Sequence, residues 1–127
     1  MAENSKSKVL VVEDDIFMIE LLAKDLQSSG FPVVIAKTGA EGVQKFQDEN
    51  PAIILLDLLL PDVGGFEALR QIRRLPKGNE VKVIILSNIG EGPDLEEAKR
   101  LGVNEYLIKA NFTLPEIIKK VEEVLAK

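Results

Sequence analysis

The feature that most constrains this chain is the regular return of short, continuously apolar runs. Five such runs, rich in Val, Ile and Leu, lie at residues 9–12, 33–35, 53–56, 83–86 and 106–108. Apolar residues at every position of so short a run are typical of strands buried on both faces of a parallel sheet. We therefore expect five strands, each followed by a connection that covers the sheet.

The segments between these runs carry the signals of helices. Apolar residues share one helical stripe at Ile16, Ile19, Leu22 and Leu26 in the first segment, and at Leu114, Ile117, Ile118, Val121 and Leu125 in the last. The stretches Thr38–Glu41 and Thr113–Glu116 have the form of a capping box, in which a hydroxyl and a carboxylate satisfy free backbone N–H groups. Gly30 and Gly102 stand where helices commonly end in a left-handed residue.

Strands that alternate with helices predict a doubly wound α/β domain of the (βα)5 type. Its crossovers are expected to be right-handed, with a parallel sheet and helices on both faces. The 127 residues suffice for one domain. We expect that domain over residues 8–126, after a polar N-terminal tail at residues 1–7.

Charge and missing residue types exclude several functions. A net charge of −5 argues against direct binding to nucleic acid, which needs Lys and Arg for the phosphates. The chain has neither Cys nor His, so any metal must be a hard cation held by oxygens. No apolar run approaches the roughly 20 residues that span a bilayer, and the first residues lack the apolar core of a signal peptide. We expect a cytoplasmic protein without a membrane segment.

Polar side chains follow four of the five predicted strands. They are Glu13, Asp14 and Asp15 after the first, Asp57 after the third, Ser87 after the fourth and Lys109 after the fifth. Ligands of open parallel sheets bind at the carboxyl ends of the strands, so these side chains are expected to converge. Clustered carboxylates repel one another unless a cation is present, and oxygens of this kind suit Mg²⁺.

This set of groups indicates phosphoryl chemistry. A carboxylate can attack a phosphoryl group to form an acyl phosphate, and Lys109 with a metal ion would neutralise the phosphoryl oxygens. Ser87 could contact one of those oxygens and so sense the phosphorylated state. Asp15 is expected to interact with the N-terminus of the following helix instead. Phe46, Phe66 and Phe112 are interpreted as packing residues.

On these motifs the sequence resembles the CheY-like response-regulator receiver domains of two-component signalling. The matching stretches are residues 9–15, 54–62, 83–87 and 105–109. The resemblance implies a flavodoxin-like fold with strand order 2-1-3-4-5. It also implies site roles. Asp57 would be the phosphoacceptor. Asp14 would be a direct Mg²⁺ ligand, and Glu13 would act mainly through metal-bound water. The backbone carbonyl of Leu59 would complete the ligands. Ser87 and Lys109 would contact the phosphoryl oxygens, and Tyr106 would change rotamer when Ser87 moves.

Four positions depart from the pattern of the family. Ala110 follows Lys109 where proline is usual; because a cis bond before a non-proline residue costs about 2.5–4 kcal/mol, we expect a trans Lys109–Ala110 bond. Asn88 stands where a smaller residue is common, which narrows access for a phosphodonor. Leu59 and Ile89 offer no hydrogen bond to orient an attacking water, so we expect slow self-dephosphorylation.

The resemblance implies a signalling switch and not an enzyme. Its expected partners are a histidine kinase or phosphotransfer protein, and then a downstream protein or a second copy of the chain. The expected output face comprises residues 95–101, Tyr106 and residues 113–125. Two alternatives stay open: a receiver-like interaction module that works without phosphorylation, and a small hydrolase or phosphotransferase with an aspartyl nucleophile, which would need a substrate pocket.

Overall fold

All five expected strands form one parallel sheet in the computed structural model, which describes residues 7–127. They are β1 (Val9–Val12), β2 (Val33–Ala36), β3 (Ile53–Leu56), β4 (Lys82–Ser87) and β5 (Glu105–Ile108). Their order in the sheet is β2-β1-β3-β4-β5, and every neighbouring pair is parallel. The predicted flavodoxin-like order is confirmed. Most of the predicted N-terminal tail lies outside the described residues.

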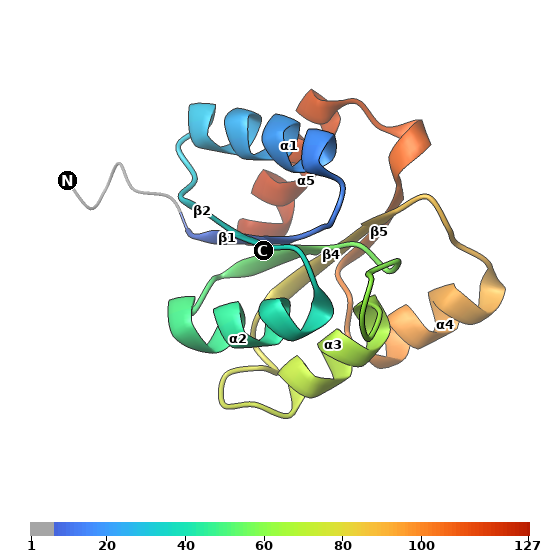
Figure 1. The fold of residues 1–127 in the computed structure, drawn as a ribbon. Helices are drawn as coiled ribbons and strands as arrows, with labels where there is room; N and C mark the ends of the chain where they lie inside the picture. Colours follow the sequence, from blue (N-terminus) through green and yellow to red (C-terminus); the bar gives the residue numbers. More distant parts are fainter. Residues whose placement is uncertain (1–6) are drawn as a thin grey trace.

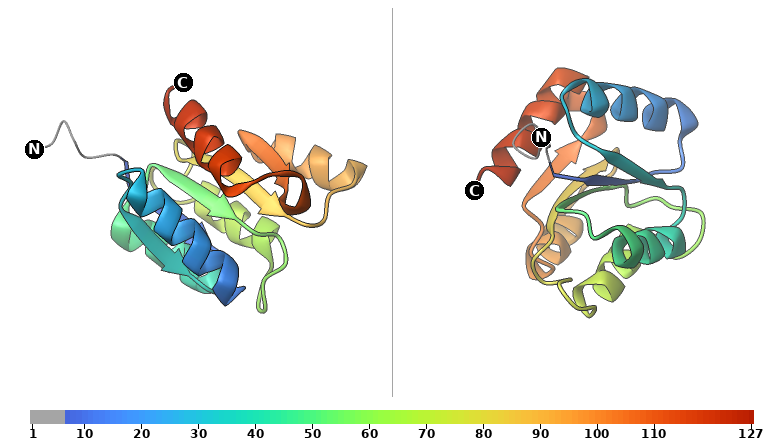
Figure 2. Two further views of the ribbon diagram at one scale, coloured as in Figure 1. Left: turned by 90° about the horizontal axis from the view of Figure 1, so that it is seen from above. Right: turned by 90° about the vertical axis from the view of Figure 1, so that its left-hand side faces the viewer.

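Helices connect the strands and cover both faces of the sheet. They are α1 (Ile16–Ser28), α2 (Gly39–Glu49), α3 (Gly65–Arg73), α4 (Gly92–Arg100) and α5 (Leu114–Leu125), with a short 3₁₀ turn at Lys109–Asn111. Helices α1 and α5 lie on one face, and α2, α3 and α4 lie on the other (Figures 1 and 2). Within residues 7–127, no helix combines the length and the apolarity needed to cross a bilayer.

The two faces of the sheet carry separate parts of the core. In β1, Val9 and Val11 pack with residues of α1 and α5, whereas Leu10 and Val12 pack with residues of α2 and α3. Successive residues of a strand point to opposite faces, so the continuous apolarity of the central strands fills both layers. The expectation of full burial is wrong for most of β2 and β5, which are only partly buried. Both are edge strands, with a neighbouring strand on one side only.

The predicted helix ends are mostly correct. Thr113 and Glu116 form the capping box expected at the start of α5. At α2 only half of the box forms, because the Glu41 carboxylate accepts a hydrogen bond from the N–H of Lys37, one residue earlier than expected. Gly30 and Gly102 have the predicted left-handed conformation, with φ of 97° and 71°.

The prediction is wrong for one residue of the core. Ile16 belongs to the apolar stripe of α1, yet it is 57% exposed, whereas Ile19, Leu22 and Leu26 are buried. Ile16 is the first residue of α1, at the end of the sheet where the strands give way to loops, so its side chain lies beyond the core. The interpretation of Phe46, Phe66 and Phe112 as packing residues is confirmed.

Candidate functional site

The register of the sheet brings the predicted site residues to one edge. Val12 is the register partner of Leu56, so the next residues, Glu13 and Asp57, emerge side by side, and the N–H of Asp57 donates to the carbonyl of Val12 at 3.0 Å. Ser87 is the register partner of Ile108, directly before Lys109. Four residues from four strand ends thus lie at the same edge of the sheet, although 96 positions separate Glu13 from Lys109.

Lys109 joins the two buried acids of the site. Its Nζ lies 2.7 Å from Oε1 of Glu13 and 3.1 Å from Oδ2 of Asp57. The three side chains are only 12%, 4% and 8% exposed, so water screens this pair of contacts weakly. Burial alone would lower the pKa of Lys109, but its hydrogen bonds to Glu13 and Asp57 outweigh burial and raise that pKa. Lys109 is therefore a cation fixed beside Asp57.

Burial raises the pKa of the Glu13 carboxyl, and the nearby charge of Asp57 adds to this effect. Hydrogen bonds from Lys109 and from the backbone N–H of Asp15, at 3.0 Å, act in the opposite direction. The direct contact of Glu13 with Lys109 is an interaction that the sequence did not reveal. Asp15 itself caps α1, because its carboxylate accepts hydrogen bonds from the N–H groups of Phe17 and Met18, as expected of a helix N-terminal acid.

The acidic groups suit a hard cation. One carboxylate oxygen from each of Glu13, Asp14 and Asp57 lies within 4.8 Å of the other two. Two of the acids are buried and Asp14 is exposed, so a cation would have protein oxygens on one side and water on the other, as Mg²⁺ prefers. The backbone of Leu59 is also at the site, since its N–H donates to Oδ1 of Asp57 at 3.2 Å. The role of its carbonyl stays a prediction.

Ser87 and Tyr106 are linked through the backbone of Ile89. Ser87 is fully buried, and its Oγ accepts a long hydrogen bond of 3.5 Å from the N–H of Ile89. The hydroxyl of Tyr106 donates to the carbonyl of Ile89 at 2.6 Å. Burial raises the pKa of Tyr106, and the charges of Asp94 and Asp57 raise it further. The sequence placed Ser87, Tyr106 and Ile89 at the site, but it did not reveal the link through the Ile89 backbone.

Asp62 is a further contributor that the sequence did not reveal. Its carboxylate accepts hydrogen bonds from the N–H groups of Gly39 and Ala40, at 2.7 and 2.8 Å, in the first turn of α2. These bonds lower the pKa of Asp62 and tie the loop after β3 to α2. More than 20 positions separate the partners, so no local signal could have found them. Residues 7–127 contain no cis peptide bond, so Lys109–Ala110 is trans as expected.

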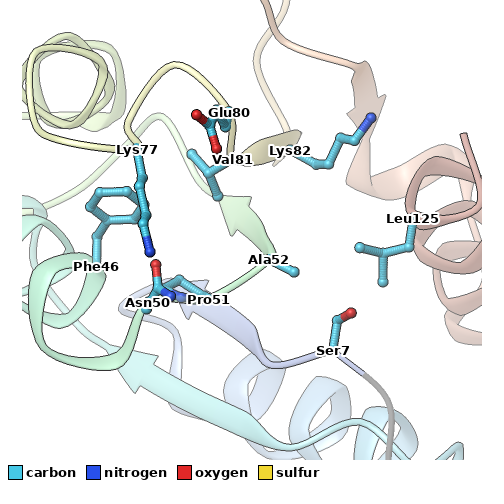
Figure 3. A pocket seen from close by; sticks show the side chains of 10 residues that line it. All are labelled: Ser7, Phe46, Asn50, Pro51, Ala52, Lys77, Glu80, Val81, Lys82 and Leu125. Carbon is cyan, nitrogen blue, oxygen red and sulfur yellow. The ribbon is translucent and has the colours of Figure 1, made fainter.

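A hollow of about 460 Å³ lies at the opposite, amino edge of the sheet (Figure 3). Figure 3 shows the side chain of Lys77 running past Phe46 toward Asn50. None of the predicted site residues lines this hollow. This hollow is therefore separate from the acidic site at the carboxyl edge of the sheet.

Comparison with known proteins agrees with this geometry. The family model described as response regulator receiver domain matches residues 9–122. The chain is 36% identical over 121 residues to a CpxR homolog of Haemophilus influenzae, described as a transcriptional regulatory protein, covering 95% of this chain and 51% of the relative. It is 31% identical over 120 residues to the phosphate regulon transcriptional regulatory protein PhoB of Rhizobium meliloti, covering 94% and 52%. The chain thus spans about half the length of these curated relatives.

Solved structures show the same fold. A CheY-like receiver domain protein from Methanospirillum hungatei JF-1 has a TM-score of 0.88 at 27% identity, with 96% of this chain and 95% of that chain covered. The receiver domain of the sensor histidine kinase PA1611 from Pseudomonas aeruginosa PAO1, solved with a magnesium ion in its active-site cleft, has a TM-score of 0.86 at 27% identity, covering 97% and 100%. The chain belongs to the response regulator receiver domains of two-component systems.

Proposed function

We propose that Asp57 accepts a phosphoryl group from a histidine kinase or phosphotransfer protein, in a Mg²⁺-dependent reaction that switches the face formed by α4, β5 and α5. The observation that carries this proposal is the position of Asp57. It is a buried carboxylate at a strand end, 3.1 Å from the ammonium of Lys109 and within 4.8 Å of two further acids. A carboxylate in such a setting can act as a nucleophile toward phosphorus.

In the proposed reaction, an oxygen of Asp57 forms a bond to phosphorus while the bond from phosphorus to the donor nitrogen breaks. The electron pair of the broken bond stays with the donor imidazole. Lys109 neutralises the phosphoryl oxygens that reach the site, because its ammonium is fixed beside Asp57 by Glu13. The N–H of Leu59 orients the Asp57 carboxylate through a 3.2 Å hydrogen bond.

The acids fit a divalent cation held by Glu13, Asp14 and Asp57. When bound, Mg²⁺ supplies positive charge that offsets both the carboxylates and the transferred phosphoryl oxygens. Without such charge, an incoming phosphoryl group meets three carboxylates and one ammonium. Catalysis by this chain's own residues is then mostly positioning and charge neutralisation.

The output of the switch is proposed to pass from Ser87 through the Ile89 backbone to Tyr106, on the face that a downstream protein or a second copy of the chain would bind. The chain would assist its own phosphorylation and dephosphorylation, as a switch and not as an enzyme. Its cytoplasmic location stays a prediction, and so does the absence of direct contact with nucleic acid or a membrane.

The test is intact-protein mass after incubation with a small acyl-phosphate donor and Mg²⁺. Wild type should gain one phosphoryl group, and a chelator should prevent the gain. Asp57→Asn should gain none, whereas Asp48→Asn, which changes an exposed acid on α2, should behave as wild type. A gain that survives in Asp57→Asn would overturn the assignment of the acceptor. No gain in wild type, with chelator making no difference, would favour the interaction module that works without phosphorylation.

A further inference from the structure

The position of the Tyr106 ring depends on a neighbour that has no side chain. The Tyr106 hydroxyl is bound to the carbonyl of Ile89, and Gly90 follows directly. A Cβ added at Gly90 would lie 3.0 Å from Cε1 and 3.2 Å from the hydroxyl oxygen of Tyr106, and 2.8 Å from Cδ1 of Ile108. Carbon atoms at optimal separation lie about 3.5–4.0 Å apart, so the neighbours would have to move.

The need for glycine here concerns space and not backbone conformation. The described glycines with positive φ are Gly30, Gly64 and Gly102, and Gly90 is not among them. Alanine could therefore adopt the backbone of Gly90, and the cost of a side chain falls on the neighbours. The methyl group of Ile108 ends a flexible side chain and can rotate away. The Tyr106 ring is rigid and its hydroxyl is tied to Ile89, so it must shift as a unit.

We propose that Gly90 is a positioning residue for Tyr106: the missing side chain at residue 90 lets the ring lie against the loop after β4 with its hydroxyl on the Ile89 carbonyl. A side chain at residue 90 displaces the ring from that place. The ring has somewhere to go, because Tyr106 also lines a hollow of about 330 Å³ between α4 and β5, together with Leu95, Ala98 and Val103.

The consequence for signalling rests on the proposed function. The carbonyl of Ile89 accepts a hydrogen bond from the Tyr106 hydroxyl, and its N–H donates to Oγ of Ser87. One residue therefore contacts both the hydroxyl proposed to sense the phosphoryl group and the aromatic side chain of the proposed output face. Displacing the ring breaks this link at one end. A side chain at residue 90 therefore uncouples Tyr106 from Ser87 while leaving the acidic site in place.

The chain provides its own reporter for a test. Tyr106 is its single tyrosine and there is no tryptophan, so tyrosine ring signals in NMR and tyrosine emission report on this residue alone. We would compare Gly90→Ala and Gly90→Val with Gly92→Ala and Gly92→Val. Gly92 is the matched control, two residues away, because a Cβ there meets nothing within 4 Å.

Crowding should favour the displaced ring. The ratio of bound to displaced Tyr106 should fall by about tenfold in Gly90→Val, which corresponds to about 1.4 kcal/mol, with Gly90→Ala between it and wild type. The ring signals of Tyr106 in NMR should shift and quenching of its emission should rise, while both Gly92 variants match wild type. Unchanged ring signals in both Gly90 variants would overturn the proposal, since the loop would then have moved instead.

A double-mutant cycle of melting temperatures distinguishes an effect of residue 90 on the Tyr106 ring from a general loss of stability. In a Tyr106→Ala background there is no ring to displace and only the contact with Ile108 remains, so Gly90→Val should lower the melting temperature less than it does when Tyr106 is present. A loss as large as in the presence of Tyr106 would contradict the proposal. All these measurements use the protein without a phosphodonor, so they decide the role of Gly90 even if Asp57 accepts no phosphoryl group.

Discussion

The ammonium of Lys109 lies closer to Glu13, at 2.7 Å, than to Asp57, at 3.1 Å. One cation from the end of β5 is thus shared by two buried acids from the ends of β1 and β3. The arrangement fixes the ammonium where a phosphoryl group would arrive. It also means that Glu13 has a role at the site through Lys109, in addition to the metal-binding role expected from the sequence.

Replacing this ammonium should slow phosphoryl acceptance while the fold persists. Lys109→Met removes a charged hydrogen-bond donor worth about 1.5–3 kcal/mol, so the initial rate of Asp57 labelling should fall by roughly ten- to hundredfold. The measurement is intact mass against time with acyl-phosphate donor and Mg²⁺. Lys120→Met is the control, because that lysine makes only 3.9 Å contacts with Glu105 and Glu123. An unchanged rate in Lys109→Met would show that its charge is not used.

Hydrolysis of the phosphorylated form should be slow in wild type and faster with a polar residue at 59. Leu59 and Ile89 are 60% and 38% exposed, and neither side chain can hydrogen-bond a water. Leu59→Asn supplies such a bond, worth about 1 kcal/mol, and should speed loss of the phosphoryl group about fivefold. The decay of the labelled mass measures this. Leu21→Asn, at an exposed position of α1, should decay as wild type does; a wild-type half-life of seconds would contradict the expectation.

The hydrogen bonds that Asp62 accepts from the first turn of α2, called here the Asp62 clamp, should make the free energy of unfolding depend on pH. Backbone hydrogen bonds from Ala40 and Gly39 lower the pKa of Asp62, so its stabilising effect is present above the ordinary value of 3.8 and is lost as pH falls through the lowered value. Asp62→Ala should therefore melt below wild type at neutral pH, with a gap that closes in acid. Asp48→Ala serves as control. A gap that stays constant from neutral to acid pH would mean that the carboxylate charge is not responsible.

In the turn after α3, substitutions at two neighbouring residues should change the free energy of unfolding in opposite directions. Lys77 has a φ of 67° in a turn closed by a 2.8 Å hydrogen bond from Gly78 to Leu75, a conformation that suits glycine. Lys77→Gly should raise the free energy of unfolding by about 0.5 kcal/mol, the strain relieved less the added freedom of the unfolded chain.

Gly78→Ala should have the opposite effect. Its Cβ would overlap the carbonyl oxygen of Ile72, so the free energy of unfolding should fall by about 2 kcal/mol. Urea titrations of both variants give the two values. Destabilisation by Lys77→Gly would show that the strain at residue 77 is offset by contacts of its side chain near Phe46 and Asn50.

The sequence by itself determined the elements that depend on neighbours in the chain. Continuous apolar runs specify strands, and their alternation with helical segments specifies parallel crossovers, but the runs did not distinguish the central strands from the edge strands β2 and β5. Polar residues directly after those runs had to lie at the carboxyl edge of the sheet. For that reason the sequence alone assigns Asp57, Ser87 and Lys109 to one site.

Tertiary structure alone decided the contacts made between distant segments and through the backbone. The pairing of Glu13 with Lys109, the Asp62 clamp and the link from Ser87 through Ile89 to Tyr106 depend on distances across the fold. The exposure of Ile16 was decided in the same way, by where the first turn of α1 lies relative to the sheet. Local patterns encode which face a residue occupies, but not which partner the packing of whole layers brings within hydrogen-bond reach.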